Sequence, residues 1–466
     1  MNRDLVIIGA GPGGYEAAIK AAQLGAKVTV IEETGLGGTC LNSGCIPTKS
    51  FYKNAETVKS LKSIEEYGIA MGNYSFDMPK AKKRKDEVVS KLVSGIDKLL
   101  KANSIEVIKG RASFKGKNVL EVISENSVEE ITLSNIIIAT GSVSSSVPVT
   151  GIDLPGVITS DEILNFEEVP KSLAILGGGV VGAEFAGIFA ALGSQVTIIE
   201  FLPKILYRLD DELSKKLAVY MKKQGIKILT GSALKEVHKA EEGLKLTVDS
   251  GKGIFEVQCD YLLSAAGRKP NIDGLNLEAA GIKYDKKGIK VDEKYMTSAE
   301  GVYAIGDVIG GTMLAHIASE EGKSCVEGIY EHTLPQLNYN AVPSCVFTFP
   351  EAASVGMTED EAKEANIEYV IGKSMFGANG KALAMGEGEG FVKVMAEKDS
   401  HKIIGVHIMG PHASDIVHEG SMAIKNGLKV EDIKTTVFAH PTLSEVFYEA
   451  VCCCTGDAIH SMPKKK

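Results

Sequence analysis

The sequence predicts an α/β fold with two Rossmann-like nucleotide-binding domains and a C-terminal α+β domain. The first observation behind this prediction is a strand–glycine turn–helix–strand unit near the N-terminus, and the second is a copy of that unit 168 positions downstream. Alternating apolar segments after about residue 338, without a glycine fingerprint, predict an antiparallel sheet followed by helices. At 466 residues the chain is too long for one ordinary core.

The first unit starts with the apolar strand 5–8 and continues through a glycine turn into a helix pattern over 16–24. A second strand, 27–31, follows and ends in an acid. In such a unit the first glycine makes a tight turn, the second lets backbone amides reach a pyrophosphate, and the third lets the helix pack closely on the strand. The phosphates lie at a helix N-terminus, and the acid is placed to bind a ribose diol. These residues are Gly9, Gly11, Gly14 and Glu32.

The second unit repeats the first closely. The segment Leu-Gly-Ala-Lys-Val-Thr-Val-Ile-Glu at 24–32 corresponds to Leu-Gly-Ser-Gln-Val-Thr-Ile-Ile-Glu at 192–200. A single glycine motif also occurs in ordinary turns, but two copies in the same context indicate two bound dinucleotides. The residues of the second copy are Gly177, Gly179, Gly182 and Glu200.

Two cysteines, Cys40 and Cys45, lie just downstream of the first unit. The N-terminus leads straight into a strand without a secretory pattern, so we expect a cytoplasmic protein. In that compartment a close cysteine pair is more often redox-active or metal-binding than structural. Zinc would need about four ligands, usually as two close pairs, and no second pair of this kind follows. We therefore expect redox chemistry and no metal.

The position of the cysteines indicates which cofactor each unit binds. The first unit leads into the cysteine pair, so its ligand should present a redox ring to sulfur. FAD fits because a flavin exchanges electrons with both thiolates and hydride donors. The second unit would then bind NAD. Glu200 favours NAD over NADP because a carboxylate repels a 2′-phosphate, although Lys204 could face a phosphate.

The residues after the cysteines predict a helix that begins at Cys45. Pro47 suits its first turn, and a helix N-terminus stabilises a thiolate. Lys49 lies four residues on, on the same helical face. The sequence thus places a cation beside the second sulfur.

Hydropathy and charge exclude other classes of protein. No run approaches the roughly 18 to 20 apolar residues of a membrane span. The net charge of −9 argues against nucleic acid as a partner, and we interpret the basic run 80–85 as a solvated helix face. We therefore expect no membrane and no nucleic acid.

Two segments suggest how the chain passes between its domains. The stretch 141–155 is rich in Ser, Val and Pro and is interpreted as a connector between the two nucleotide domains. The segment 301–307 reads as a strand that ends in an acid, and we expect it to return to the first domain.

These features together resemble the pyridine nucleotide–disulfide oxidoreductases, from near residue 3 to near residue 460. The motifs that carry the resemblance are GGTCLNSGCIPTK at 37–49, ATGS at 139–142, Gly-Asp at 306–307, MLAH at 313–316 and HPTLSE at 440–445. The resemblance implies a homodimer with four segments per chain. These are an FAD domain over 1–145, an NAD domain over 146–268, a segment returning to the FAD domain over 269–338 and a dimerisation domain over 339–466.

The resemblance also implies roles for single residues. Cys45 would lie nearest the flavin and Cys40 would exchange with substrate, while Lys49 would lie near the flavin with Glu184 as its partner. His440 would be the base, oriented by Glu445, and both would complete the site of the other subunit. The remaining implied contacts are Ala112, Thr140, Gly141, Asp307, Met313, Leu314 and Ala315 for FAD, and Val237 and Gly267 for NAD.

Within the family, the resemblance is strongest to enzymes that oxidise a dihydrolipoyl group with NAD. The lipoyl group would arrive on another protein, an E2 or H-protein. A glutathione-reductase-like enzyme is disfavoured by Glu200 and the HPTLSE motif. A mercuric-reductase-like enzyme is disfavoured because tyrosine would be expected in place of His440. A non-catalytic scaffold is a further alternative, which the intact set of cysteines, histidine and glutamate makes a poor explanation.

Three adjacent cysteines, 452–454, have no place in this scheme. Neighbouring residues on a helix point about 100° apart, so three in a row make no chelating face. We expect them to pack beneath the C-terminal helices rather than to form a second redox pair. Cys259, Cys325 and Cys345 are interpreted as buried thiols.

Overall fold

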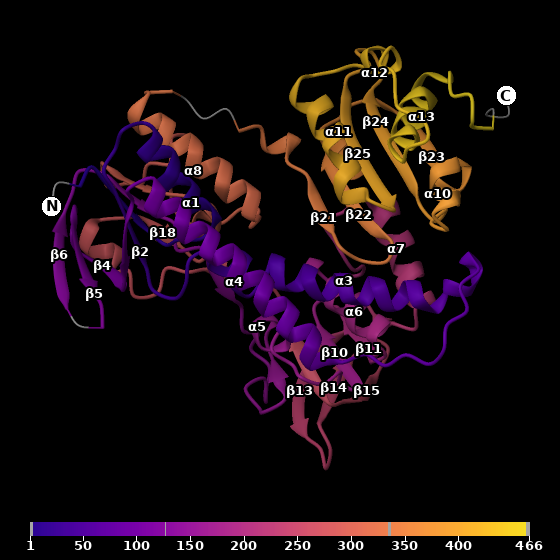
Figure 1. Ribbon diagram of the computed structural model, residues 1–466, viewed down its shortest axis with the longest axis horizontal. Coiled ribbons are helices and arrows are strands. Elements are labelled where there is room, and N and C mark those ends of the chain that lie inside the picture. The colour runs from indigo at the N-terminus through magenta and orange to yellow at the C-terminus, as the bar shows by residue number, and fades with distance from the viewer. Residues whose placement is uncertain (1–2, 126, 334–336, 463–466) are drawn as a thin grey trace.

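The computed structural model of the protein describes residues 3–125, 127–333 and 337–462. Figure 1 shows three lobes: the first at the left, the second at the bottom and the third at the upper right. Two long helices, α3 (Cys45–Lys62) and α4 (Met78–Ala102), cross the centre between them. The mixed α/β fold expected from the sequence is confirmed.

The first lobe is built on a five-stranded parallel sheet in the order β20–β7–β1–β2–β3. Val6 and Ile8 face a three-stranded meander, whereas Leu5 and Ile7 face the helices on the other side. Because both faces are covered, the central strands are continuously apolar. The strands of the sheet are β1 (Leu5–Ile8), β2 (Val28–Glu32), β3 (Glu106–Lys109), β7 (Ile136–Ile138) and β20 (Val302–Ala304). The meander is β4 (Arg111–Gly116), β5 (Val119–Ile123) and β6 (Val128–Thr132), and the helices include α1 (Pro12–Gln23) and α8 (Ala315–Tyr330).

Helices α1 and α8 pack together closely although 300 residues separate them. A Cβ on Gly13 would lie 2.9 Å from the carbonyl oxygen of Ala318, and one on Gly322 would lie 2.6 Å from that of Gly13. Strand β20 meanwhile completes the edge of the sheet beside β7. The segment beyond residue 300 is thus part of the first lobe.

The second lobe repeats this plan, with a parallel sheet in the order β12–β11–β10–β16–β9. Leu173 and Ile175 pack against α6, whereas Ala174 packs against a second meander. The elements are β9 (Val157–Ile158), β10 (Ser172–Leu176), α6 (Val180–Leu192), β11 (Gln195–Ile199), α7 (Asp211–Lys223), β12 (Lys227–Leu229), β13 (Ala233–Lys239), β14 (Leu244–Asp249), β15 (Ile254–Cys259) and β16 (Tyr261–Ser264).

The third lobe is the expected antiparallel sheet with helices, in the order β21–β22–β25–β24–β23. One face packs on α11 and α13, and Phe391 and Met409 on the other face join the core of the second lobe. The elements are β21 (Ser344–Val346), β22 (Glu351–Gly356), α9 (Glu359–Glu364), β23 (Tyr369–Met375), α10 (Gly380–Ala384), β24 (Phe391–Glu397), β25 (Ile403–Gly410), α11 (Ala413–Lys425), α12 (Val430–Lys434) and α13 (Ser444–Thr455). The smaller remaining elements are α2 (Gly38–Asn42), β8 (Ser142–Ser144), α5 (Ser160–Ile163), β17 (Arg268–Pro270), β18 (Tyr284–Asp285) and β19 (Gly288–Ile289).

The stretch 141–155 contains β8, which pairs with β17 in an antiparallel ribbon that joins the first two lobes. One detail differs from the sequence interpretation. The basic run 80–85 is not wholly solvated: Lys85 is only 4% exposed, and its ammonium is paired with Asp86 at 2.6 Å. The helix around it, α4, is as expected.

Candidate active site

The first glycine turn is shaped by backbone contacts that exclude side chains. A Cβ on Gly14 would lie 1.9 Å from the carbonyl oxygen of Gly9, so α1 packs directly on the strand end. Gly9 has φ +104°, a conformation that favours glycine. A Cβ added to Gly11, in contrast, would have the Cα of Gly38 as its nearest neighbour, at 3.9 Å. This leaves open space at the N-terminus of α1, where a pyrophosphate fits.

The Glu32 carboxylate closes this turn from the end of β2. It accepts hydrogen bonds from the backbone N–H groups of Ala10 at 2.7 Å, Thr34 at 2.7 Å and Gly35 at 3.0 Å. The acid therefore holds the glycine turn itself in place, and its contact with a ribose remains a prediction.

The second turn has the same construction. A Cβ on Gly182 would lie 2.0 Å from the oxygen of Gly177, and a Cβ on Gly179 would meet nothing within 4 Å. Glu200 accepts hydrogen bonds from Gly178 N–H at 2.6 Å and Leu202 N–H at 2.7 Å. Both turns thus have the shape of dinucleotide sites.

Lys204 is held within the chain. Its ammonium lies 3.3 Å from Asp211 and 3.4 Å from the carbonyl oxygen of Leu209. The Lys204 ammonium is thus paired with the first residue of α7, an arrangement that does not favour contact with a 2′-phosphate.

The Asp307 carboxylate lies where the first two lobes join. It accepts a hydrogen bond of 2.5 Å from Ser142 Oγ, and Ser142 Oγ accepts one of 2.7 Å from Arg268 Nε. The neighbouring Gly306 N–H donates at 2.6 Å to Glu321, a buried carboxylate on α8 whose pKa burial raises. Glu321 was missed in the sequence because no motif spacing connects it to Gly306.

The other expected cofactor contacts differ in accessibility. Thr140 and Gly141 are half-buried: the Thr140 hydroxyl donates to the carbonyl oxygen of Asn271, and the Asn271 N–H donates to the carbonyl oxygen of Gly141. Gly267 has φ +117° and open space beside it. The segment Met313, Leu314 and Ala315 is half-buried where α8 begins. Ala112 and Val237 have buried side chains in β4 and β13, so any ligand contact there would be made by backbone.

Cys40 and Cys45 lie in two consecutive helices, the short α2 and the long α3. Cys40 is in α2, and Cys45 is the first residue of α3, as expected. A hydrogen bond from Cys40 and the Lys49 ammonium lower the pKa of Cys45 to about 7, against burial and the Glu184 carboxylate, which raise it. The same hydrogen bond raises the pKa of Cys40. Thiolate character is therefore concentrated on Cys45.

Lys49 and Glu184 form the expected pair. The Lys49 ammonium lies 3.0 and 2.8 Å from the two carboxylate oxygens. A third residue, Phe347, was not foreseen: its ring centroid lies 4.2 Å from Lys49 Nζ, and its N–H donates to Glu184 at 3.1 Å. The cation–π contact with Lys49 and the hydrogen bond to Glu184 together hold the ion pair in place beside Cys45.

His440 and Glu445 form a second pair, on the third lobe. His440 Nδ1 lies 2.9 Å from Glu445 Oε1, and Thr442 N–H donates to the other oxygen at 2.8 Å. Although burial opposes it, these hydrogen bonds lower the pKa of Glu445. The His440 side chain is 78% exposed, and within the described residues its hydrogen-bond partner is Glu445 rather than a cysteine.

The C-terminal cysteines are packing residues in the structure. Cys452 is buried, and Cys453 Sγ donates to the carbonyl oxygen of Lys373 at 3.3 Å. Cys259 and Cys325 are buried and Cys345 is half-buried. In residues 3–125, 127–333 and 337–462, no group of three or more His, Cys, Asp or Glu side chains could hold a metal ion, and no helix is long and apolar enough to cross a membrane.

Comparison with known proteins identifies the family. Residues 3–322 match the pyridine nucleotide–disulphide oxidoreductase model, and residues 342–451 match the dimerisation domain of these proteins. The chain is 40% identical to dihydrolipoyl dehydrogenase of Geobacillus stearothermophilus, covering 100% of this chain and 98% of the relative. It is 42% identical to the mitochondrial dihydrolipoyl dehydrogenase of Pisum sativum, covering 98% and 93%.

Among solved structures, LpdA from Mycobacterium tuberculosis superimposes with a TM-score of 0.90 at 25% identity, covering 97% of this chain and 99% of that one. The two glycine turns, the Cys40–Cys45 pair and these full-length matches agree. The chain belongs to the pyridine nucleotide–disulphide oxidoreductase family.

Proposed function

We propose that the chain is a dihydrolipoyl dehydrogenase, which oxidises a protein-bound dihydrolipoyl group and reduces NAD. The observation that carries the proposal is the placement of Cys45, which begins α3 directly beside the Lys49–Glu184 pair. It is supported by relatives of that name at 40 and 42% identity over nearly the whole chain.

The residues present fit the two cofactors that this reaction needs. The open space beside Gly11 and Gly179, each at a helix N-terminus, accommodates pyrophosphate groups. We assign FAD to the first turn, with Asp307 near its ribityl chain, and NAD to the second, with Glu200 near its ribose. When bound, FAD would accept the electron pair from the cysteines and NAD would take it up as hydride.

The chain's own residues carry the thiol chemistry. In the oxidised enzyme Cys40 and Cys45 form a disulfide. His440 of the partner subunit removes a proton from one dihydrolipoyl thiol, whose sulfur attacks Cys40 and releases Cys45 as a thiolate. The second dihydrolipoyl thiol then attacks the mixed disulfide, which yields the oxidised lipoyl ring and leaves two reduced cysteines. The Lys49 ammonium stabilises the thiolate on Cys45.

Glu445 orients the base in this scheme. Its hydrogen bond to Nδ1 leaves Nε2 as the ring nitrogen that takes the proton. Because the His440 side chain is largely exposed in the single chain, we assign it to the site of a second copy. The dimerisation-domain match of residues 342–451 supports a homodimer.

The proposal includes the partners and the location. The lipoyl group would arrive on an E2 or H-protein, and we place the enzyme in the cytoplasm. Glutathione-reductase-like activity with NADPH is not favoured, since Glu200 closes the second turn and Lys204 is paired with Asp211.

The test is purification followed by assay. The protein should be yellow, retain FAD and reduce NAD with dihydrolipoamide. Loss of all flavin on purification, or turnover only with NADPH and glutathione disulfide, would reject the proposal.

A further inference from the structure

The third lobe contains a lysine that is almost wholly buried against the second lobe. The Lys393 side chain on β24 is 1% exposed, and its neighbours Val392 and Val394 face α11 and α13 on the opposite side. Its ammonium lies 2.5 Å from Asp210 Oδ1 and 2.9 Å from Glu359 Oε1. A buried charge needs such partners, because desolvation otherwise makes it very costly.

Asp210 connects this lysine to the nucleotide lobe. The carboxylate is 2% exposed and caps α7 by accepting hydrogen bonds from the N–H groups of Glu212 and Leu213. Lys393 and the first turn of α7 therefore share the same carboxylate oxygen. The position of α7 is tied to a strand of the third lobe.

The loop 201–209 links this anchored helix to the second glycine turn. Leu206 N–H donates to the carbonyl oxygen of Gly178 at 2.7 Å, and a Cβ on Gly178 would lie 2.7 Å from Ile205. On the other side, Ser214 of α7 donates to the carbonyl oxygen of Ile205 at 2.7 Å. The loop is thus held between the turn and the helix.

We propose that Lys393 is a positioning residue for the nicotinamide dinucleotide site, fixing the loop 201–209 against Gly178 through Asp210 and α7. The inference rests on the proposed function, which assigns the second glycine turn to NAD. The third lobe thereby contributes to dinucleotide affinity without touching the dinucleotide.

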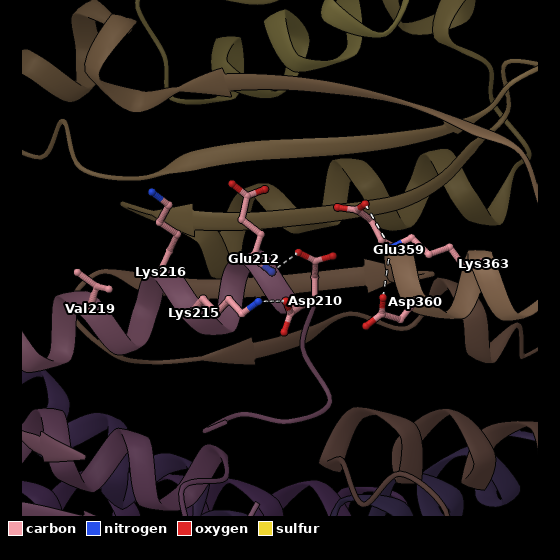
Figure 2. A pocket seen from close by; sticks show the side chains of 9 residues that line it. Asp210, Glu212, Lys215, Lys216, Val219, Glu359, Asp360 and Lys363 are labelled. Carbon is pink, nitrogen blue, oxygen red and sulfur yellow. Dashed lines mark hydrogen bonds and ion pairs between the residues drawn. The ribbon is translucent and has the colours of Figure 1, made fainter. Parts of the chain in front are cut away.

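An open cleft lies beside the contact between Lys393, Asp210 and Glu359. Figure 2 shows side chains of α7 and α9 facing a cavity of about 460 Å³. Two of its lysines pair with neighbouring acids: Lys215 lies 2.5 Å from Asp211, and Lys363 lies 3.4 Å from Asp360. We interpret the cleft as the solvated side of the ion-pair cluster.

The experiment uses the flavin-containing enzyme and the substitution Lys393→Met. We expect the Kd of NADH to rise by about tenfold, a typical size for coupling between separate sites. Amide hydrogen exchange in residues 201–210 should become faster without NADH. The flavin spectrum and the rate of flavin reduction by dihydrolipoamide should stay as in the wild type.

The matched control is Lys398→Met. Lys398 follows directly after β24 and pairs at the surface with Glu368 at 2.6 Å. This ion pair does not involve α7, so NADH affinity should be unchanged. An equal loss of affinity in this control would overturn the proposal.

A second variant separates positioning from charge balance. Lys393→Met leaves the Asp210 and Glu359 carboxylates without their cation, which could prevent folding. The triple variant Lys393→Met, Asp210→Asn and Glu359→Gln removes these two charges as well. We expect the triple variant to bind NADH as weakly as the single variant. Wild-type NADH affinity and wild-type exchange of the loop in the triple variant would overturn the proposal. If wild-type protein itself failed to bind NADH, the proposed function would fail, whereas loop exchange would still test the role of Lys393.

Discussion

The Lys49 ammonium lies 2.8 Å from a carboxylate oxygen of Glu184, and this contact joins α3, the helix that begins at Cys45, to the second lobe. Phe347 of the segment after β21 contacts both partners. The central helix α3, the second lobe and the third lobe therefore meet at one ion pair beside Cys45.

The Cys45 thiolate should be visible in the reduced enzyme as a long-wavelength charge-transfer absorbance between its sulfur and the flavin. The pKa of Cys45 is lowered from 9.0 to about 7, so the thiolate persists above about pH 7 and the absorbance should fall as the pH decreases through that value. Lys49→Met removes a cation that lowers this pKa and should move the midpoint to higher pH. Lys53→Met, on the same helix but paired with Glu56 at the surface, is the control. An identical midpoint in both variants would contradict this role of Lys49.

His440→Gln should slow dihydrolipoamide oxidation by about 10² or more, since general base catalysis contributes typically 10²- to 10⁴-fold. The flavin spectrum should be unchanged because the residue lies on an exposed part of the third lobe. His460→Gln is a close control, as His460 also pairs with a glutamate, Glu449 at 2.8 Å. Steady-state and stopped-flow rates check the prediction, and undiminished turnover in His440→Gln would remove this residue from the mechanism.

Gly14→Ala should abolish flavin retention. The added Cβ would lie 1.9 Å from the Gly9 oxygen, so α1 would have to move away from the strand end that shapes the turn. Gly95→Ala is the opposite case: Gly95 is within α4 and its Cβ would meet nothing within 4 Å. It should stabilise the protein by about 0.5–1 kcal/mol, the usual difference in helix propensity between glycine and alanine. Flavin absorbance of the purified protein measures the effect of Gly14→Ala, and thermal unfolding measures that of Gly95→Ala. Retention of flavin by the Gly14→Ala protein would contradict the first expectation.

Replacing Cys452, Cys453 and Cys454 with serine should leave turnover within about a factor of two, since the Cys453 and Cys454 thiols donate to backbone carbonyl oxygens, as a serine hydroxyl can. Stability should fall by about 1–3 kcal/mol, chiefly because Cys452 is buried and serine places a hydroxyl there. Turnover assays and denaturant unfolding test the two parts. A large selective loss of turnover would point to a second redox pair.

Much of the fold was predictable because its determinants are local. Each glycine turn, its helix and its closing acid lie within about 25 consecutive residues, and the start of α3 at Cys45 follows from the residues beside it. The antiparallel third sheet was likewise visible in alternating segments.

The parts that were missed depend on distant packing. Phe347 reaches Lys49 from nearly 300 residues away, and no spacing in the sequence predicts that contact. Lys85 was read as solvated because its neighbours are basic, whereas it is buried and paired with Asp86. The hydrogen bonds from backbone N–H groups to Glu32 and Glu200 were also unforeseen, since the sequence suggests a ribose partner for each acid.

The contact between Gly13 and Gly322 has a consequence for synthesis on the ribosome. The N-terminal sheet lacks its edge strand and one covering helix until more than 300 residues have been translated, which takes about 15–60 s at roughly 5–20 residues per second. During that interval the nascent first lobe exposes an apolar helix surface and an open strand edge. The first lobe can therefore complete its sheet only after the whole second lobe has been translated.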